Sequence, residues 1–170
     1  MLDTPPGAAT RPTLNRVREA LFNILAPNLP GARFLDLFAG SGANGIEALS
    51  RGAEHATFAE ESGASLTVLR ANLAKVRFAD KADVVRSSLP RDARLLKKQD
   101  KKFDIVFADP PYDFTEYASL GGSLHEYSLL NEGAVIAIEH HMDSAIGDEI
   151  GPYNRSRIAK YGEVRLSFYS

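Results

Sequence analysis

The alternation of short apolar runs with amphipathic segments limits the folds open to this chain. Apolar runs that suit strands occupy residues 32–38, 55–61, 82–87, 102–108 and 133–141. Segments that suit helices lie between them, at residues 44–52, 62–76, 90–98 and 116–130. Continuously apolar strands that alternate with helices predict a mostly parallel sheet covered by helices on both faces.

Two further segments lie at the ends of this pattern. Residues 13–25 place Val17, Leu21 and Ile24 on one helical face. Residues 156–170 have the composition of a closing hairpin. The whole pattern predicts an α/β fold with a doubly wound Rossmann-like sheet, in one domain over residues 1–170 that carries an N-terminal helix at about 13–25.

Composition agrees with a single domain. A chain of 170 residues, 44% hydrophobic and 25% charged, has room for one sizeable core. The absence of cysteine excludes disulfides, thiolate metal sites and a cysteine nucleophile, and the apolar runs are far too short to span a bilayer. The first ten residues lack the features of a signal peptide, so we expect a cytoplasmic protein without a membrane partner.

The net charge of −2 conceals a basic segment between Arg86 and Lys102. Seven basic residues and two acidic ones lie in it, a local excess of five positive charges. Such a segment suits contact with nucleic-acid phosphates. A solvated helix face explains it equally well, and both interpretations stay open.

A glycine-rich turn follows the first predicted strand. The stretch "DLFAGSGANG" holds Gly40, Gly42 and Gly45, and glycines let a backbone turn tightly and pass close to a ligand. Asp36 stands four residues before Gly40, at the tip of the strand. A carboxylate there repels a pyrophosphate but suits a cationic amino-acid group, so the spacing favours S-adenosylmethionine over NAD.

A second acid, Glu60, ends the next predicted strand, 24 residues after Asp36. A carboxylate in this place can accept hydrogen bonds from both hydroxyls of a ribose, which either cofactor contains. The alternative is that Glu60 and Glu61 are a charge pair at a helix start, near Ser62.

The stretch "FDIVFADPPYDF" is a strand with an unusual ending, because two prolines remove two backbone donors. In a doubly wound sheet this strand lies beside the first, so its tip should face the cofactor's methyl group. Asp109 and a carbonyl near Pro110 can accept hydrogen bonds from the exocyclic amine of a base, and Tyr112 can stack on that base. Such a base must be unpaired or flipped out. An ordinary β-turn with a buried tyrosine is the alternative.

Four stretches in this order, "TRPTLNRVREALFNIL", "LDLFAGSGANGIEALSRGA", "FAEE" and "DIVFADPPY", resemble the RsmD family of bacterial RNA methyltransferases. The resemblance covers nearly the whole chain, including the terminal "GEVRLSFYS". It implies the class I methyltransferase sheet, with seven mostly parallel strands and an antiparallel last strand. It also implies methylation of a guanine N2 amine in 16S ribosomal RNA, with S-adenosylmethionine converted to S-adenosylhomocysteine.

The resemblance also implies roles for matching residues. The cofactor-binding residues would be Thr13, Arg16, Asp36, Phe38, Gly40, Gly42, Glu60, Glu61, Ser87 and Ser88. The catalytic residues that hold the guanine would be Asp109, Pro110, Pro111 and Tyr112. The expected contacts to nucleic acid are Arg11, supported by the family motif, Arg18 beside the predicted pocket, and Arg91, Lys97 and Lys98 of the basic segment, although Arg18 fits a solvated helix surface equally well.

Several questions stay open at this point. The partner would be 16S rRNA or the small ribosomal subunit, as an assembly intermediate, and we expect a monomer. Methyl transfer from a sulfonium needs no metal, so His140 and His141 are expected to be polar loop residues. Glu139 either contacts RNA or caps a loop. The rival functions are an adenine-N6 DNA methyltransferase, an NAD-dependent oxidoreductase and a non-catalytic cofactor-binding module.

Overall fold

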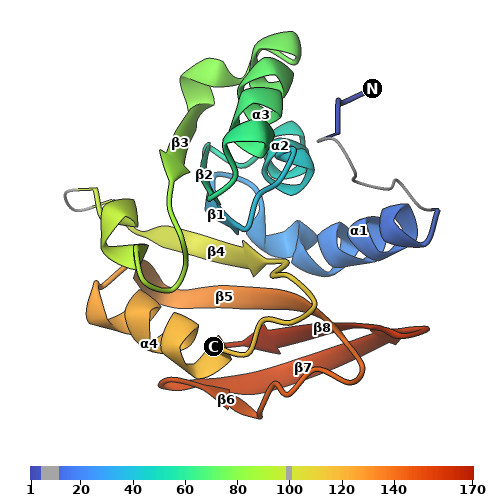
Figure 1. The fold of residues 1–170 in the computed structure, drawn as a ribbon, viewed down its shortest axis with the longest axis vertical. Coiled ribbons are helices and arrows are strands. Elements are labelled where there is room, and N and C mark those ends of the chain that lie inside the picture. Colours follow the sequence, from blue (N-terminus) through green and yellow to red (C-terminus); the bar gives the residue numbers. More distant parts are fainter. Residues whose placement is uncertain (5–11, 99–100) are drawn as a thin grey trace.

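The computed structural model describes residues 1–4, 12–98 and 101–170 (Figure 1). Its helices are α1 (Pro12–Leu25), α2 (Ala43–Ser50), α3 (Gly63–Lys75) and α4 (Tyr117–Glu126), with short 3-10 turns η1 (Ala26–Asn28), η2 (Ala79–Lys81) and η3 (Ala93–Leu96). Its strands are β1 (Arg33–Leu37), β2 (His55–Glu60), β3 (Ala82–Arg86), β4 (Phe103–Ala108), β5 (Leu130–His141), β6 (Glu149–Ile150), β7 (Tyr153–Tyr161) and β8 (Val164–Tyr169).

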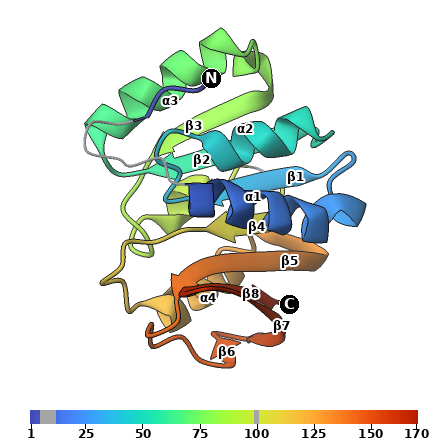
Figure 2. The same ribbon diagram turned by 90° about the vertical axis from the view of Figure 1, so that its right-hand side faces the viewer.

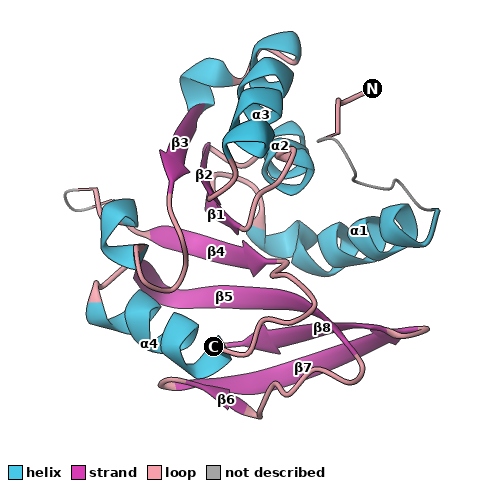
Figure 3. Cartoon of the chain, viewed as in Figure 1, coloured by secondary structure: helices cyan, strands magenta, loops and turns pink. Residues whose placement is uncertain are grey.

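These described strands form one sheet in the order β3-β2-β1-β4-β5-β8-β7-β6 (Figure 3). The first five strands along the chain pair in parallel, and β6, β7 and β8 pair antiparallel. The strand order reverses between β1 and β4. In sheets of this kind a ligand binds beyond the carboxyl ends of the strands at such a reversal.

Helices cover both faces of the sheet (Figures 1 and 2). On one face, α1, α2 and α3 bury apolar side chains against alternate residues of β1, β2 and β4. On the other face, η3 and α4 pack against the remaining residues of those strands and of β5. The doubly wound α/β fold predicted from the sequence is therefore confirmed.

Two details of the prediction were wrong. The expected helix at 90–98 is only the single turn η3, which buries Ala93 and Leu96 and is preceded by an Asp92 carboxylate that accepts the Ser88 N–H at 2.9 Å. The described sheet has eight strands, with three antiparallel at its end, because β6 adds to the hairpin. Two residues are too few to show a strand period in the sequence.

Two glycines, Gly121 and Gly122, lie in the middle of α4 although glycine weakens a helix, and the packing of β6 explains the first of them. A Cβ at Gly121 would collide with the Ile150 carbonyl of β6, whereas a Cβ at Gly122 would meet nothing within 4 Å. A side chain at Gly121 would therefore block the close approach of α4 to β6, whereas one at Gly122 would not.

We expect Gly121→Ala to lower the free energy of unfolding by about 1–3 kcal/mol, because an inserted methyl must push α4 off β6. Gly122→Ala is the matched control, and it should raise that free energy by up to about 1 kcal/mol through helix propensity. Chemical denaturation of both variants measures the effect. Equal shifts in the two variants would contradict the close approach.

Candidate functional site

Two clefts open at the carboxyl edge of the sheet, and both include the tip of β4. The β1–β4 cleft encloses about 270 Å³ and is lined by Phe38, Ala59, Glu60, Glu61, Ser87, Leu89, Asp109 and Pro111. The β4–β5 cleft encloses about 180 Å³ and is lined by Asp109, Pro110, Pro111, Tyr112, Tyr117, Glu139, His140, His141, Ser144 and Val164. Asp109 and Pro111 belong to both, so the two clefts meet at the "DPPY" tip.

The glycine turn after β1 is held in shape by Asp36. This side chain is only 1% exposed, and its carboxylate accepts the N–H of Gly45 in α2 at 2.9 Å. Burial raises the pKa of Asp36 well above its ordinary value. Gly40 and Gly42 have φ of 56° and 83°, which glycine adopts without strain. Asp36 therefore ties the start of α2 to the tip of β1.

Phe38 also has a positive φ, 57°, directly after β1. A bulky residue rarely adopts this conformation, and the strain it stores is typical of functional sites. The backbone N–H of the next residue, Ala39, donates to the Ala59 carbonyl at 3.0 Å and so fixes the turn against β2. The strained turn places the Phe38 side chain in the lining of the β1–β4 cleft.

Glu60 holds the same turn from the β2 side. Its Oε1 accepts the N–H of Gly40 at 2.8 Å, and its Oε2 accepts the N–H groups of Glu61 and Ser62, each at 2.7 Å. A carboxylate has about four acceptor positions. Glu60 therefore retains capacity to accept a hydroxyl hydrogen bond at Oε1 while it supports the turn.

These residues fit S-adenosylmethionine. Ser87 is 5% exposed, lines the cleft, and its hydroxyl has no partner among the described residues. A buried hydroxyl without a partner is costly, and a ligand's adenine edge would satisfy it. A Cβ at Gly40 would enter open space, so backbone and ligand can approach closely there. Ser87 and Glu60 would then hold the adenosine part, when the cofactor is bound.

Two of the expected cofactor contacts, Ser88 and Arg16, line other hollows of the surface, and Asp36, Gly40 and Gly42 shape the turn beside the cleft without lining it. Ser88 lines a separate surface hollow beside α4, because its backbone turns toward Asp92. Arg16 is exposed and lines a groove between α1 and the β7–β8 hairpin. Thr13 lies in α1, but its side chain is outside what the structure describes.

Tyr112, in the turn that follows β4, has an exposed aromatic ring. Tyr112 is 75% exposed, with its ring edge against the His141 ring at 5.3 Å between centroids. The Phe114 N–H donates to the Pro111 carbonyl at 2.9 Å and closes the turn. The alternative of a buried tyrosine in a β-turn is therefore wrong, and Tyr112 is available to stack on a planar ligand.

Three carboxyl groups and one arginine gather on the α1 side of this tip. Asp36 and Glu139 lie near the carboxyl ends of β1 and β5, Asp109 directly follows β4, and Arg18 reaches them from α1. Desolvation raises the pKa of Asp109 to about 6, although the side chain keeps contact with water in the cleft. Desolvation, together with the charge of Asp109, raises the pKa of Glu139 to about 8. Sequence patterns alone left the role of Glu139 undecided, because its neighbours depend on strand order.

The pKa of Glu139 predicts a pH-dependent stability. The folded chain holds a proton on Glu139 up to about pH 8, whereas an unfolded chain loses it near pH 4. The free energy of unfolding should therefore fall as the pH rises toward and through 8. Denaturation of the wild type and of Glu139→Gln between pH 6.5 and 9 measures this, because the variant lacks the titrating group. Parallel pH curves for the two proteins would contradict the assignment.

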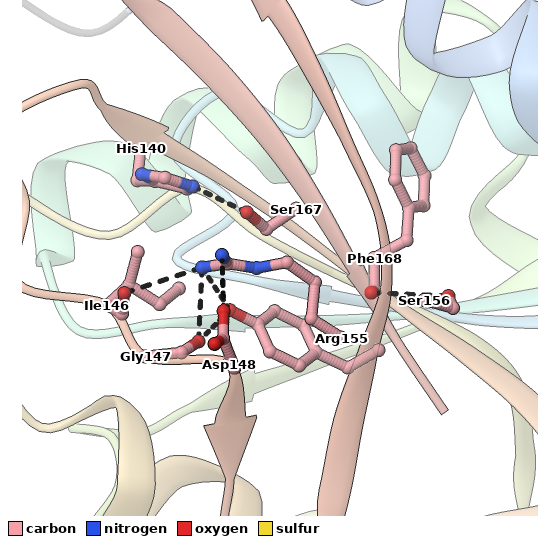
Figure 4. A network of polar contacts seen from close by, with 9 residues as sticks. His140, Ile146, Gly147, Asp148, Arg155, Ser156, Ser167 and Phe168 are labelled. Carbon is pink, nitrogen blue, oxygen red and sulfur yellow. Dashed lines mark hydrogen bonds and ion pairs between the residues drawn. The ribbon is translucent and has the colours of Figure 1, made fainter.

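Residues 146–148 are joined to β7 and β8 by polar contacts (Figure 4). Arg155 bonds Asp148 at 3.0 Å and the Gly147 carbonyl at 3.1 Å, and the Tyr169 hydroxyl donates to the same carbonyl at 2.8 Å. His140 is buried in β5 with its Nε2 2.7 Å from the Ser167 hydroxyl. His140, which lines the β4–β5 cleft, is therefore joined to β8 through its side chain.

The expected nucleic-acid contacts are scattered. Arg18 lies within the acidic group, where its Nε donates to the Asn44 amide oxygen at 3.1 Å. Arg91 bonds Asp92, and Lys98 pairs with Asp83 at 3.0 Å. Lys97 and Lys98 precede β4, and Lys98 pairs with Asp83 near the start of β3, so both lie at the edge of the sheet opposite the clefts. Arg11 lies outside the described residues.

Membrane spans and metal clusters are both absent from the described part of the chain. None of its helices is long and apolar enough to cross a membrane. Within the same residues no group of three histidine, cysteine, aspartate or glutamate side chains is placed to hold a metal ion.

Comparison with known proteins identifies the family to which the chain belongs. A family model described as conserved hypothetical protein 95 matches residues 1–170. Ribosomal RNA small subunit methyltransferase D of Escherichia coli (strain K12) is 36% identical over 168 residues, which cover 99% of this chain and 83% of the relative. The protein of that name from Haemophilus influenzae is 36% identical over 137 residues, which cover 80% of this chain and 70% of the relative.

Two solved structures share the fold of this chain. Hypothetical protein TTHA0928 of Thermus thermophilus matches with a TM-score of 0.80 at 31% identity, over 99% of this chain and 91% of that chain. SMU.776, solved in complex with SAH, matches with a TM-score of 0.73 over 95% of this chain and 50% of that chain, and its 15% identity shows a shared fold. The model match over the full chain and the 36% identity to methyltransferase D show that the chain belongs to the RsmD family.

Proposed function

We propose that this protein transfers a methyl group from S-adenosylmethionine to the exocyclic N2 amine of a guanine in 16S ribosomal RNA. One observation carries the proposal: the β1–β4 cleft and the β4–β5 cleft meet at Asp109 and Pro111. A cofactor in the first cleft and a base in the second would bring their reacting atoms together at that point. Names of relatives, such as ribosomal RNA small subunit methyltransferase D, support the RNA substrate.

The bound cofactor supplies an electrophilic methyl group on a positively charged sulfur. The amine nitrogen forms the new N–C bond, the C–S bond breaks with its electron pair left on sulfur, and the amine loses one proton. Asp109 accepts a hydrogen bond from the amine, and a carbonyl of the proline turn can accept the second. These bonds reduce the delocalisation of the nitrogen lone pair into the ring and orient that lone pair toward the methyl group. The chain therefore acts mainly by positioning the amine.

The remaining residues hold the base. Tyr112 offers an exposed ring on which a flipped-out base can stack, a contact worth about 1–3 kcal/mol in other nucleic-acid complexes. Asp109, with its pKa near 6, is ionised at neutral pH and can pass the released proton to water. No step in this scheme requires a metal, and we propose a monomer that acts in the cytoplasm on 16S RNA or on an assembling small subunit.

Transfer of labelled methyl tests the proposal. Small ribosomal subunits and naked 16S RNA from a strain lacking this protein are incubated with the protein and labelled S-adenosylmethionine, and the nucleosides are then analysed. N2-methylguanosine at one site is the expected product. N6-methyladenine in DNA would support the rival DNA enzyme, and binding of NAD in place of S-adenosylmethionine would support the oxidoreductase. Binding of S-adenosylmethionine without turnover on any substrate would support the non-catalytic module.

A further inference from the structure

Glu139 is a carboxyl group that the scheme above does not use. The parallel register pairs Ala108 with Ile138, so Asp109 and Glu139 follow side by side at the ends of β4 and β5. Both line the β4–β5 cleft. Neither carboxyl group forms a hydrogen bond or ion pair with any residue in the described part of the chain. Glu139 is half-buried, and a polar group in such a place is costly unless something bonds to it.

We propose that the Glu139 carboxyl group recognises the N1–H and O6 atoms of the target guanine and selects guanine over the other bases that carry an amine. This inference rests on the proposed function, because it assumes that the N2 amine lies at Asp109. N1 is the ring atom next to that amine, and O6 is the group beyond it. The neighbouring position of Glu139 in the same cleft is where those two atoms would lie.

The hydrogen-bonding pattern of the bases explains the selection. Beyond its amine, guanine presents a donor at N1 and then an acceptor at O6. Adenine presents an acceptor at N1 followed by a C–H group, and cytosine presents two acceptors. A carboxylic acid has one acceptor oxygen and one O–H donor. It can therefore make two good bonds with guanine and only one with adenine or cytosine.

The surroundings of Glu139 favour this protonated form. Asp109, directly after β4, and Arg18 on α1 face the Glu139 carboxyl group, and the effects of burial and of the Asp109 charge outweigh that of the arginine. His141 lies on the same strand, but its ring is turned to Asp143 and Glu163. Glu139 is therefore the carboxyl group of the pair whose protonated form is favoured more, and Asp109 is the more acidic partner, so the cleft offers two different carboxyl groups for two different parts of the base.

A base analogue and two variants test the inference. The target guanine is replaced by 2-aminopurine, which keeps the 2-amine but has a lone pair at N1 and no O6, in 16S RNA ligated around a synthetic segment. For the wild type, kcat/KM should be about 10- to 100-fold higher on guanine, the range expected of the lost hydrogen bonds. Glu139→Ala should lose more than that factor on guanine, where two hydrogen bonds are lost, and a smaller factor on 2-aminopurine, where only the bond to N1 is lost.

Glu139→Gln completes the test, because an amide offers the same acceptor and donor as a carboxylic acid. Its kcat/KM on guanine should stay within about threefold of the wild-type value. This change is smaller than the change expected from the loss of one hydrogen bond. Glu132→Gln, at the exposed start of the same strand, is the matched control and should change nothing.

Either of two results would overturn the inference. One is equal kcat/KM of the wild type on guanine and 2-aminopurine, which needs no variant to fold. The other is an equal loss on both substrates in Glu139→Ala, since that is what a purely structural role predicts. If the wild type methylates no guanine at all, the proposed function itself has failed, so the two failures are distinguishable.

Discussion

Asp109→Ala should reduce kcat/KM for methyl transfer to RNA by about 100- to 1,000-fold, the effect of removing one aligned hydrogen-bonding group from a reaction centre. Asp109 is the residue at which the two clefts meet, and alanine leaves the amine with no acceptor on that side. The affinity for S-adenosylmethionine, measured by calorimetry, should change much less than the rate. Asp113→Asn, an exposed acid of the same loop, serves as the control and should retain wild-type activity.

The pH dependence of kcat/KM provides a second test of the role of Asp109. The ionised carboxylate is a stronger hydrogen-bond acceptor for the amine than the protonated acid, so kcat/KM of the wild type should fall as the pH drops through about 6. Asp109→Asn keeps an acceptor oxygen but has no proton to gain, so its profile should lack this acidic limb. Full activity in Asp109→Ala, or an unchanged acidic limb in Asp109→Asn, would contradict the role.

The sequence predicted most of the fold because its main elements carry strong local patterns. The runs that became β1, β2 and β4 are continuously apolar, and α1 and α3 have regular helical spacing. The failures lie where long-range packing decides the structure. β6 exists because Ile150 packs under α4, and the segment around η3 has too few buried side chains for a full helix.

The sequence predicts the position of those candidate site residues that lie at the ends of strands. Asp36, Glu60 and Asp109 each stand at or directly after a strand tip, so a parallel sheet brings them to one edge. Glu139 and Arg18 could not be placed in this way. Their proximity to Asp109 depends on β5 lying next to β4 and on the path of α1 across the sheet. Lys97 and Lys98 lie at the opposite edge because the chain returns there before β4 begins, and their contact with nucleic acid stays a prediction.

Gly45→Ala should both destabilise the protein and weaken the binding of S-adenosylmethionine. A Cβ at Gly45 would collide with the ring of Phe58, which is fully buried in β2 and has no space to move. α2 must then shift outward, at a cost of about 1–3 kcal/mol in the free energy of unfolding. The shift strains the bond from the Gly45 N–H to Asp36 and moves the glycine turn that follows β1.

The two effects in Gly45→Ala can be separated by measurement. Chemical denaturation gives the loss of stability, and calorimetric titration under folding conditions gives the affinity, which should fall at least about tenfold, or about 1.4 kcal/mol. Gly122→Ala, also in a helix but with open space around its Cβ, should leave the affinity unchanged. A destabilised Gly45→Ala that binds the cofactor normally would show that the start of α2 packs the core but does not shape the cofactor site. Normal stability and normal affinity together would mean that the ring of Phe58 gives way, and the close contact between α2 and β2 would then have no role in holding the turn.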